Sequence, residues 1–283
     1  MRAGSLTHGA SSDLQGTRDA MPTSPSGSSH PRPTSARGNA DCPWDLFDSD
    51  AYLRHNYGAV HELDRLIIRR MAEFFGSITP EPGWHGVDVG AGTNLYPALA
   101  MLPLVRSVTL WEHSLANVQW LQHGLSPQSQ VWHPFWELLA GSAPLYRQFT
   151  RAHELLPERA TVEKASVFDL PEQAWDIGTM FFVAESITGV RGEFELATEK
   201  FVRALRPGSP LTAAFMRDSQ GYQVGEHWFP AVAVTEDDID DLLRRLGAEV
   251  RVERVSSTHK LREGFDGMIV VTGWRSTRRR AEA

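Results

Sequence analysis

The sequence predicts a Rossmann-like α/β protein with a mostly parallel seven-stranded sheet, an antiparallel C-terminal strand, helices on both faces and an N-terminal helical cap. Three observations predict this fold. Short apolar segments alternate with amphipathic ones through most of the chain. A glycine-rich turn follows the first apolar segment, and the acid Glu112 follows the second, about 20 residues later. Ligands are therefore expected beyond the carboxyl ends of the strands.

Helices are predicted where apolar residues recur every three or four positions behind a capping residue. Asp48 precedes the first helix, Ser114 precedes the helix after the second strand, and Gly247 ends the last helix. The predicted helices span residues 51–57, 61–75, 96–102, 115–123, 194–205 and 236–246.

Strands are predicted at short apolar segments between these helices, with the last two forming an antiparallel pair. They span residues 86–89, 107–111, 160–164, 177–183, 211–216, 249–255 and 268–272. Site residues should come from the carboxyl ends of the parallel strands. Those ends lie at Gly90, Glu112, Ser166, residues 182–185 and residues 217–219.

Composition indicates one domain with a large core, over residues 41–275, and limits the classes of partner that the protein can bind. The chain has 283 residues, is 41% hydrophobic and carries a net charge of -7, which argues against nucleic acid or an anionic membrane as partner. Cys42 is the only cysteine, and the histidines lack ligand spacing, so no disulfide or metal site is expected. No apolar run approaches the roughly 20 residues of a membrane span. We expect a cytoplasmic protein, monomer or homodimer.

Three segments lie outside the predicted sheet and its helices. Residues 1–40 are rich in Ser, Gly, Pro and Thr and are expected to be disordered. Residues 127–157 are too long for an ordinary connection, so one or two inserted helices are expected, either over a pocket or on the surface. Their Trp132, His133 and Trp136 could form a lid wall or pack in the core. Residues 276–283 form a basic, solvated tail.

The glycine turn is typical of a site for an adenosine ligand. A dinucleotide fingerprint needs a third glycine at position 95, and Leu95 stands there. The pattern Gly90-Ala91-Gly92 after Asp88 fits S-adenosylmethionine better, because that ligand has no pyrophosphate. An NAD-dependent enzyme is therefore disfavoured, while a glycine turn in another α/β protein is the remaining alternative.

Three stretches resemble a known family. They are FDSDAYLRHNY at residues 47–57, DVGAGTNLY at 88–96 and SQGYQVGEHWF at 219–229. With Glu112, Asn117 and residues 206–208 (Arg-Pro-Gly), they resemble class I S-adenosylmethionine-dependent methyltransferases. The closer resemblance is to the nicotinamide, phenylethanolamine and indolethylamine N-methyltransferases and their actinobacterial relatives. One actinobacterial branch methylates an indole carbon in alkaloid assembly.

The resemblance implies cofactor contacts at Tyr52, Tyr57, Asp88, Gly90, Ala91, Gly92, Tyr96, Glu112, Asn117, Ser166 and Val167. It places Tyr52 and Tyr57 over the methionine end of the cofactor, and Tyr96 on its carboxylate. It places Glu112 on the ribose hydroxyls and Asn117 near the ribose or adenine.

The chain departs from the family where an acid usually binds the adenine amino group. Ser166-Val167 stands at that position, with Asp169 three residues later. This departure leaves the adenine contact open.

The substrate side is expected to follow the fourth and fifth strands. The resemblance aligns Glu185 with an acid that faces the substrate amine, and either an amine or an indole nucleophile needs a base nearby. Glu185 is thus the predicted catalytic residue, with a structural carboxylate as the alternative. The other expected substrate contacts are Asp218, Ser219, Tyr222, His227 and Trp228.

These features predict an S-adenosylmethionine-dependent methyltransferase that yields S-adenosylhomocysteine and acts on a small aromatic amine or indole-type metabolite of secondary metabolism. The alternative is an inactive regulatory protein of the same fold that binds either form of the cofactor.

Overall fold

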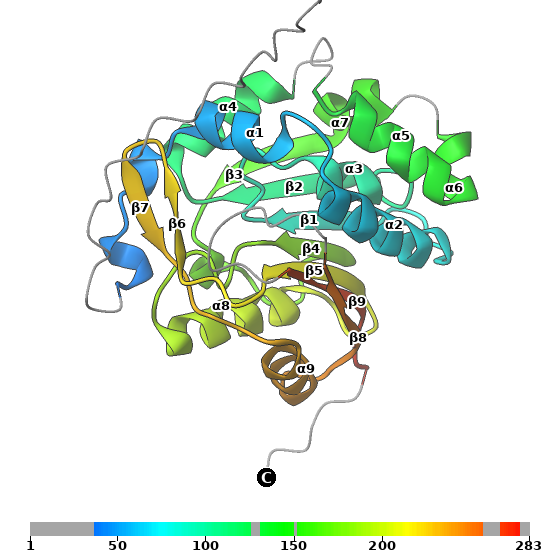
Figure 1. Ribbon diagram of the computed structural model, residues 1–283. Helices are drawn as coiled ribbons and strands as arrows, with labels where there is room; N and C mark the ends of the chain where they lie inside the picture. The colour runs from blue at the N-terminus through cyan, green and yellow to red at the C-terminus, as the bar shows by residue number, and fades with distance from the viewer. Residues whose placement is uncertain (1–36, 126–130, 150–151, 257–266, 278–283) are drawn as a thin grey trace, which may run out of the picture. The chain divides into compact units, whose positions relative to one another are not determined.

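The computed structural model describes residues 37–125, 131–149, 152–256 and 267–277 (Figure 1). These belong to a compact unit of residues 33–283. The predicted disordered segment therefore lies outside the described residues up to position 36, and a short 3-10 helix already begins at Asn39. The basic tail lies outside them beyond residue 277.

The described residues form a seven-stranded sheet in the order β3-β2-β1-β4-β5-β9-β8. Neighbouring strands from β3 to β5 pair in parallel, and β9 runs antiparallel to both β5 and β8. This confirms the predicted fold class. The strands are β1 (His85–Val89), β2 (Ser107–Glu112), β3 (Ala160–Lys164), β4 (Ile177–Phe181), β5 (Pro210–Met216), β8 (Ala248–Val255) and β9 (Met268–Arg275).

Helices cover both faces of this sheet. Figure 1 shows α2, α3 and α5 on one side and α8 and α9 on the other. The helices are α1 (Ser49–Tyr57), α2 (Glu62–Gly76), α3 (Tyr96–Met101), α4 (Leu115–Gly124), α5 (His133–Ser142), α6 (Pro144–Gln148), α7 (Ala152–Arg159), α8 (Arg191–Ala204) and α9 (Glu236–Arg245). Short 3-10 helices lie at η1 (Asn39–Asp41), η2 (Trp44–Leu46) and η3 (Val167–Asp169).

Two large apolar clusters hold the layers together. On one face, Ile67 and Phe75 of α2 belong to the same apolar cluster as Leu110 of β2. On the other face, Phe201 of α8 packs with Val87 of β1. Each of these side chains is fully buried. Burying one large apolar side chain stabilises the folded state by roughly 1.5–3 kcal/mol. The carboxyl ends of the strands are thereby fixed relative to one another.

The segment predicted as an insert contains α5, α6 and α7 in its described part, one helix more than expected. Trp132 and Trp136 are buried, and Trp132 packs on Tyr57 with ring centroids 5.7 Å apart. His133 is exposed and pairs with Glu137. None of the described residues of this segment lines the cavities discussed below, and Trp132 and Trp136 belong to the apolar core.

A hairpin that the sequence did not predict lies after β5. Its strands are β6 (Gly221–Val224) and β7 (His227–Pro230), which pair antiparallel. Phe229 of this hairpin stacks on Trp44 at a centroid distance of 4.8 Å and is fully buried. The N-terminal segment and the hairpin are thus packed together beside the carboxyl ends of the strands (Figure 1).

Candidate active site

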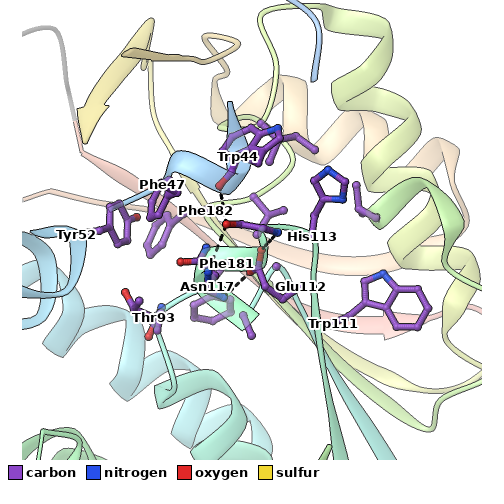
Figure 2. A pocket seen from close by; sticks show the side chains of 18 of the residues that line it. Trp44, Phe47, Tyr52, Thr93, Trp111, Glu112, His113, Asn117, Phe181 and Phe182 are labelled. Carbon is purple, nitrogen blue, oxygen red and sulfur yellow. Dashed lines mark hydrogen bonds between the residues drawn. The ribbon is translucent and has the colours of Figure 1, made fainter. Parts of the chain in front are cut away.

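A cavity opens at the carboxyl ends of the parallel strands, as the sequence predicted (Figure 2). Its empty volume is about 780 Å³ including the mouth, within the usual range for a small-molecule site. Its walls come from the loops after β1, β2, β3 and β4 and from the N-terminal segment.

The glycine turn after β1 needs glycine for two reasons. Gly90 and Gly92 have φ angles of 65° and 51°, which L-residues with a side chain rarely adopt. A Cβ at Gly90 would lie 2.5 Å from Val183 Cγ2. The turn is anchored by the Gly90 N–H, which donates to the Trp111 carbonyl across 2.7 Å. The backbone consequently faces the cavity without side chains in the way.

Glu112 is held at this turn by backbone donors. Its Oε2 accepts from the Gly92 N–H at 2.8 Å, and its Oε1 accepts from the Ser114 N–H at 2.7 Å. Burial raises the pKa of this carboxyl, and the bonds from Ser114 and Gly92 oppose that rise. The Asn117 side chain and the His113 backbone also bond to this carboxylate, and Glu112 lines the cavity. These bonds hold the carboxylate, an acceptor with about four lone-pair sites, where it meets donors of a molecule in the cavity.

Polar contacts draw the N-terminal segment over the same cavity. Asn117 Oδ1 accepts from Ser49 Oγ at 2.7 Å, and Ser114 Oγ donates to the Trp44 carbonyl at 2.6 Å. In Figure 2, Asn117 and Glu112 lie side by side, below Trp44. This packing joins the first turn of α4 to the segment before α1, and residues of both line the pocket.

Several buried polar atoms at the glycine turn have no hydrogen-bond partner among the described residues. They are Thr93 Oγ1, both side-chain polar atoms of Asn94, and Tyr96 Oη. Leaving such a group unsatisfied costs about 1–3 kcal/mol. Thr93 and Asn94 line the cavity. The sequence analysis did not predict these two residues as part of the site. The available signal was their position, because both are polar residues directly after a glycine turn.

The predicted cofactor residues fall into two groups. Those lining the cavity are Tyr52, Tyr57, Gly90, Ala91, Gly92, Glu112, Asn117, Ser166 and Val167. Asp88 and Tyr96 lie behind the wall. Asp88 Oδ1 accepts from Thr179 Oγ1 at 2.7 Å, and burial raises the pKa of Asp88 to about 8. Tyr96 is fully buried and stacks on Phe135 at 5.8 Å.

The wall after β3 lacks an acid among its described residues. Ser166 Oγ accepts from the Phe168 N–H, and the Ser166 carbonyl accepts from Trp111 Nε1 at 2.9 Å. Asp169 is exposed and does not line the cavity. A ligand at this wall can meet backbone groups and the rings of Trp111 and His113.

A second cavity adjoins the first, with an empty volume of about 950 Å³ including its mouth. The residues that line both cavities are Tyr52, Tyr57, Phe182 and Tyr222, here called the shared aromatic wall. Phe182 adopts a φ of 61°, a left-handed conformation that is unusual for a bulky side chain. Ser219 lines the second cavity, as does Asp64, which the sequence reading did not single out.

Comparison with known proteins shows which family has these cavities. The sequence profile described as the NNMT/PNMT/TEMT family matches residues 41–273. The chain belongs to this family. It is 23% identical over 255 residues to phenylethanolamine N-methyltransferase of Macaca mulatta, covering 80% of this chain and 86% of that protein.

Two solved structures are similar to this family member. A chain in the complex that contains the Haloferax volcanii Trm112 methyltransferase activator is 13% identical, with 82% of this chain and 97% of that chain covered at a TM-score of 0.50. A Burkholderia thailandensis 1,6-didemethyltoxoflavin-N1-methyltransferase, with 1,6-didemethyltoxoflavin and S-adenosylhomocysteine bound, is 15% identical over 81% and 86% of the two chains at a TM-score of 0.45.

This protein is thus an S-adenosylmethionine-dependent methyltransferase, and its first cavity fits that cofactor. The acceptor positions of Glu112 suit hydroxyl donors, while the unpartnered atoms of Thr93 and Asn94 suit a charged amino-acid group. Within the described residues, no group of three or more His, Cys, Asp or Glu could hold a metal ion. None of the described helices combines the length and apolar character that a membrane span requires.

Glu185, the predicted catalytic residue, lies behind the wall of the methyltransferase's second cavity. Its Oε1 accepts from the Met216 N–H at 2.8 Å and from Ser186 Oγ at 3.2 Å, while Oε2 has no partner among the described residues. Burial raises its pKa to about 7. Ser186 and Met216 line the second cavity, but Glu185 lines neither. In this structure it therefore holds the wall, the arrangement expected of a structural carboxylate.

The predicted substrate residues divide in the same way. Ser219 and Tyr222 line the second cavity. Asp218 forms an ion pair with Arg217, and His227 and Trp228 belong to β7 of the hairpin, where Trp228 packs beneath Gly221. None of these last three lines either cavity.

Proposed function

We propose that this enzyme methylates a small aromatic acceptor that carries an N–H group, either an aromatic amine or an indole-type metabolite. The observation that carries the proposal is the shared aromatic wall. It separates a cavity with the polar groups for the cofactor from a second cavity large enough for a two-ring acceptor. The methyl group would cross at this wall.

On the cofactor side, the proposed roles follow from the polar groups that line the cavity. Glu112 accepts from the ribose hydroxyls with its carboxylate oxygens. Thr93 and Asn94 bind the methionine end, which satisfies their buried polar atoms. The backbone at Ser166 and Val167 meets the adenine, in place of the acid that the family usually has there.

On the acceptor side, rings and hydroxyls dominate. When bound, S-adenosylmethionine supplies an electrophilic methyl group on a positively charged sulfur. Tyr52 and Tyr57 present rings that favour a nearby cation, and together with Phe182 they keep water from the transfer path. Tyr222 Oη donates to the Ser186 carbonyl at 3.2 Å, which fixes that ring in the wall. A planar aromatic acceptor fits such a surface.

The wider setting is part of the same proposal. The net charge of -7 and the single cysteine support a cytoplasmic enzyme without a nucleic-acid partner, acting as monomer or homodimer. The resemblance to actinobacterial relatives supports a place in secondary metabolism.

Incubation with methyl-labelled cofactor and a panel of phenylethylamines, tryptamines, indoles and non-aromatic amines tests the proposal. We expect label in at least one aromatic N–H compound and none in the non-aromatic amines. Tight binding of S-adenosylhomocysteine without turnover of any acceptor would favour the regulatory alternative. Transfer to non-aromatic acceptors alone would contradict the proposed substrate class.

A further inference from the structure

Asp64 is a carboxylate on the buried face of a helix. It belongs to α2, whose neighbouring Leu63, Ile67 and Ile68 are buried in the core. Asp64 itself is only 3% exposed. A carboxylate in such surroundings costs several kcal/mol unless a partner compensates for the lost water. Its presence therefore calls for a partner.

The described residues supply little compensation for Asp64. No Lys, Arg or His among them forms an ion pair with it. The backbone of His61 at the start of α2 offers a hydrogen bond, and burial still raises the Asp64 pKa to about 7. This hydrogen bond at the start of the helix uses one acceptor position of the Asp64 carboxylate. A carboxylate has further acceptor positions that this bond does not use.

Asp64 lines the second cavity, so its carboxylate is available to a molecule bound there. The ionisable groups around it there are His55 and His61, with the hydroxyls of Tyr52, Tyr57 and Tyr222. Among the described lining residues, Asp64 is the acid, since Glu185 lies behind the wall. It does not line the cofactor cavity.

Building on the function proposed above, we propose that Asp64 binds the N–H group of the acceptor and so selects nitrogen-bearing aromatic substrates. The N–H can belong to a protonated side-chain amine or to an indole ring, since both donate to a carboxylate. A cationic amine gains more, because it also restores the charge balance of a buried carboxylate. Asp64 is thereby assigned as a specificity-determining residue, and the shared aromatic wall as the surface that orients the ring.

The test measures binding to protein saturated with S-adenosylhomocysteine, by calorimetry. The probes are tryptamine, indole and benzothiophene, which is an indole isostere without the N–H. Asp64→Asn is compared with Glu73→Gln, an exposed acid on the same helix. We expect wild type and Glu73→Gln to prefer tryptamine and indole over benzothiophene by tenfold or more, and Asp64→Asn to lose most of that preference. The difference between tryptamine and indole separates the amine from the ring N–H as the group bound.

A second readout uses pH. Tryptamine affinity should weaken below about pH 7 as Asp64 becomes protonated, and this dependence should disappear in Asp64→Asn while any contribution of His55 and His61 remains. Retained preference for N–H probes in Asp64→Asn would overturn the inference. So would a loss of S-adenosylhomocysteine affinity in that variant, which would assign Asp64 to the cofactor. If wild type binds S-adenosylhomocysteine but none of the nitrogen probes, the proposed function fails first, and this inference fails with it.

Discussion

The Gly92 N–H donates to Glu112 Oε2 across 2.8 Å and thereby joins the turn after β1 to the end of β2. The two residues are twenty apart in sequence but share one wall of the first cavity. The bond fixes the carboxylate where the glycine backbone leaves room for a ligand.

Replacing Glu112 with Gln should weaken cofactor binding. The amide would turn a donor toward the Gly92 or Ser114 N–H and would lose the charge that strengthens bonds from the ribose. We expect S-adenosylhomocysteine affinity to fall at least tenfold, or by about 1.4 kcal/mol. Calorimetric titration measures this, with Glu163→Gln on exposed β3 as control. Equal affinities in the two variants would remove Glu112 from the site.

Alanine at Gly90 should destabilise the protein even without ligand. The added Cβ would sit 2.5 Å from Val183 Cγ2, at a φ that strains any side chain. We expect a loss of about 1–3 kcal/mol in the free energy of unfolding. Gly192→Ala in α8 meets no atom within 4 Å and should instead gain up to about 1 kcal/mol. Urea unfolding compares the two, and a Gly90 variant as stable as the Gly192 variant would refute the geometry.

Valine at Thr93 and at Thr212 should have different consequences. Both hydroxyls are buried without a partner among the described residues, but Thr93 lines the cofactor cavity while Thr212 lies within β5. Each change removes an unsatisfied group, so the ligand-free protein should be as stable or up to about 1 kcal/mol more stable. We expect Thr93→Val alone to weaken S-adenosylhomocysteine binding, by about tenfold. Thermal melts with and without ligand measure both effects, and unchanged binding in Thr93→Val would contradict the assignment.

The ligand-free enzyme should lose stability from Asp88 as pH rises. Burial raises the pKa of this carboxyl from 3.8 to about 8, so the contribution of Asp88 is fully present below about pH 4 and is lost as pH rises through 8. Asn resembles the protonated acid and keeps the Thr179 bond. We expect the stability of Asp88→Asn relative to wild type to increase between pH 5 and 8, by at most about 1.4 kcal/mol per pH unit. A difference that stays constant with pH would disprove the burial effect.

The sheet and the glycine turn could be predicted because their signals are local. The central strands β4 and β5 are short runs that are buried throughout, and Asp48 and Ser114 cap their helices through bonds to residues three positions on. The ends of the strands then follow from the topology alone. Glycine at position 90 and an acid at position 112 were accordingly found without any knowledge of tertiary contacts.

The acceptor side could not be predicted in the same way, because it depends on how the chain turns after β4. The predicted strand ran to Val183, but the left-handed conformation of Phe182 ends it at Phe181. Glu185 consequently turns inward to the Met216 N–H and not into the cavity. The sequence analysis did not single out Asp64, because its neighbours in α2 are apolar and indicate a core helix. A single acid on the apolar face of that helix was the available signal.

The hairpin was missed for a related reason. Its strands have four residues each, below the length at which alternation is clear. The two-residue turn at Gly225-Glu226, with a φ of 57° at the glycine, was the local signal. Its Phe229 stacks on Trp44, which is far away in the sequence, and such a tertiary contact leaves no local signal.

A crystal structure of the enzyme with S-adenosylhomocysteine tests most directly whether the first cavity binds the cofactor and the second cavity the acceptor. The account predicts the ribose hydroxyls on Glu112 and the sulfur beside the shared aromatic wall, directed toward the cavity that contains Asp64. A cofactor product bound without contact to Glu112, or with its sulfur directed away from Tyr52, Tyr57, Phe182 and Tyr222, would contradict it.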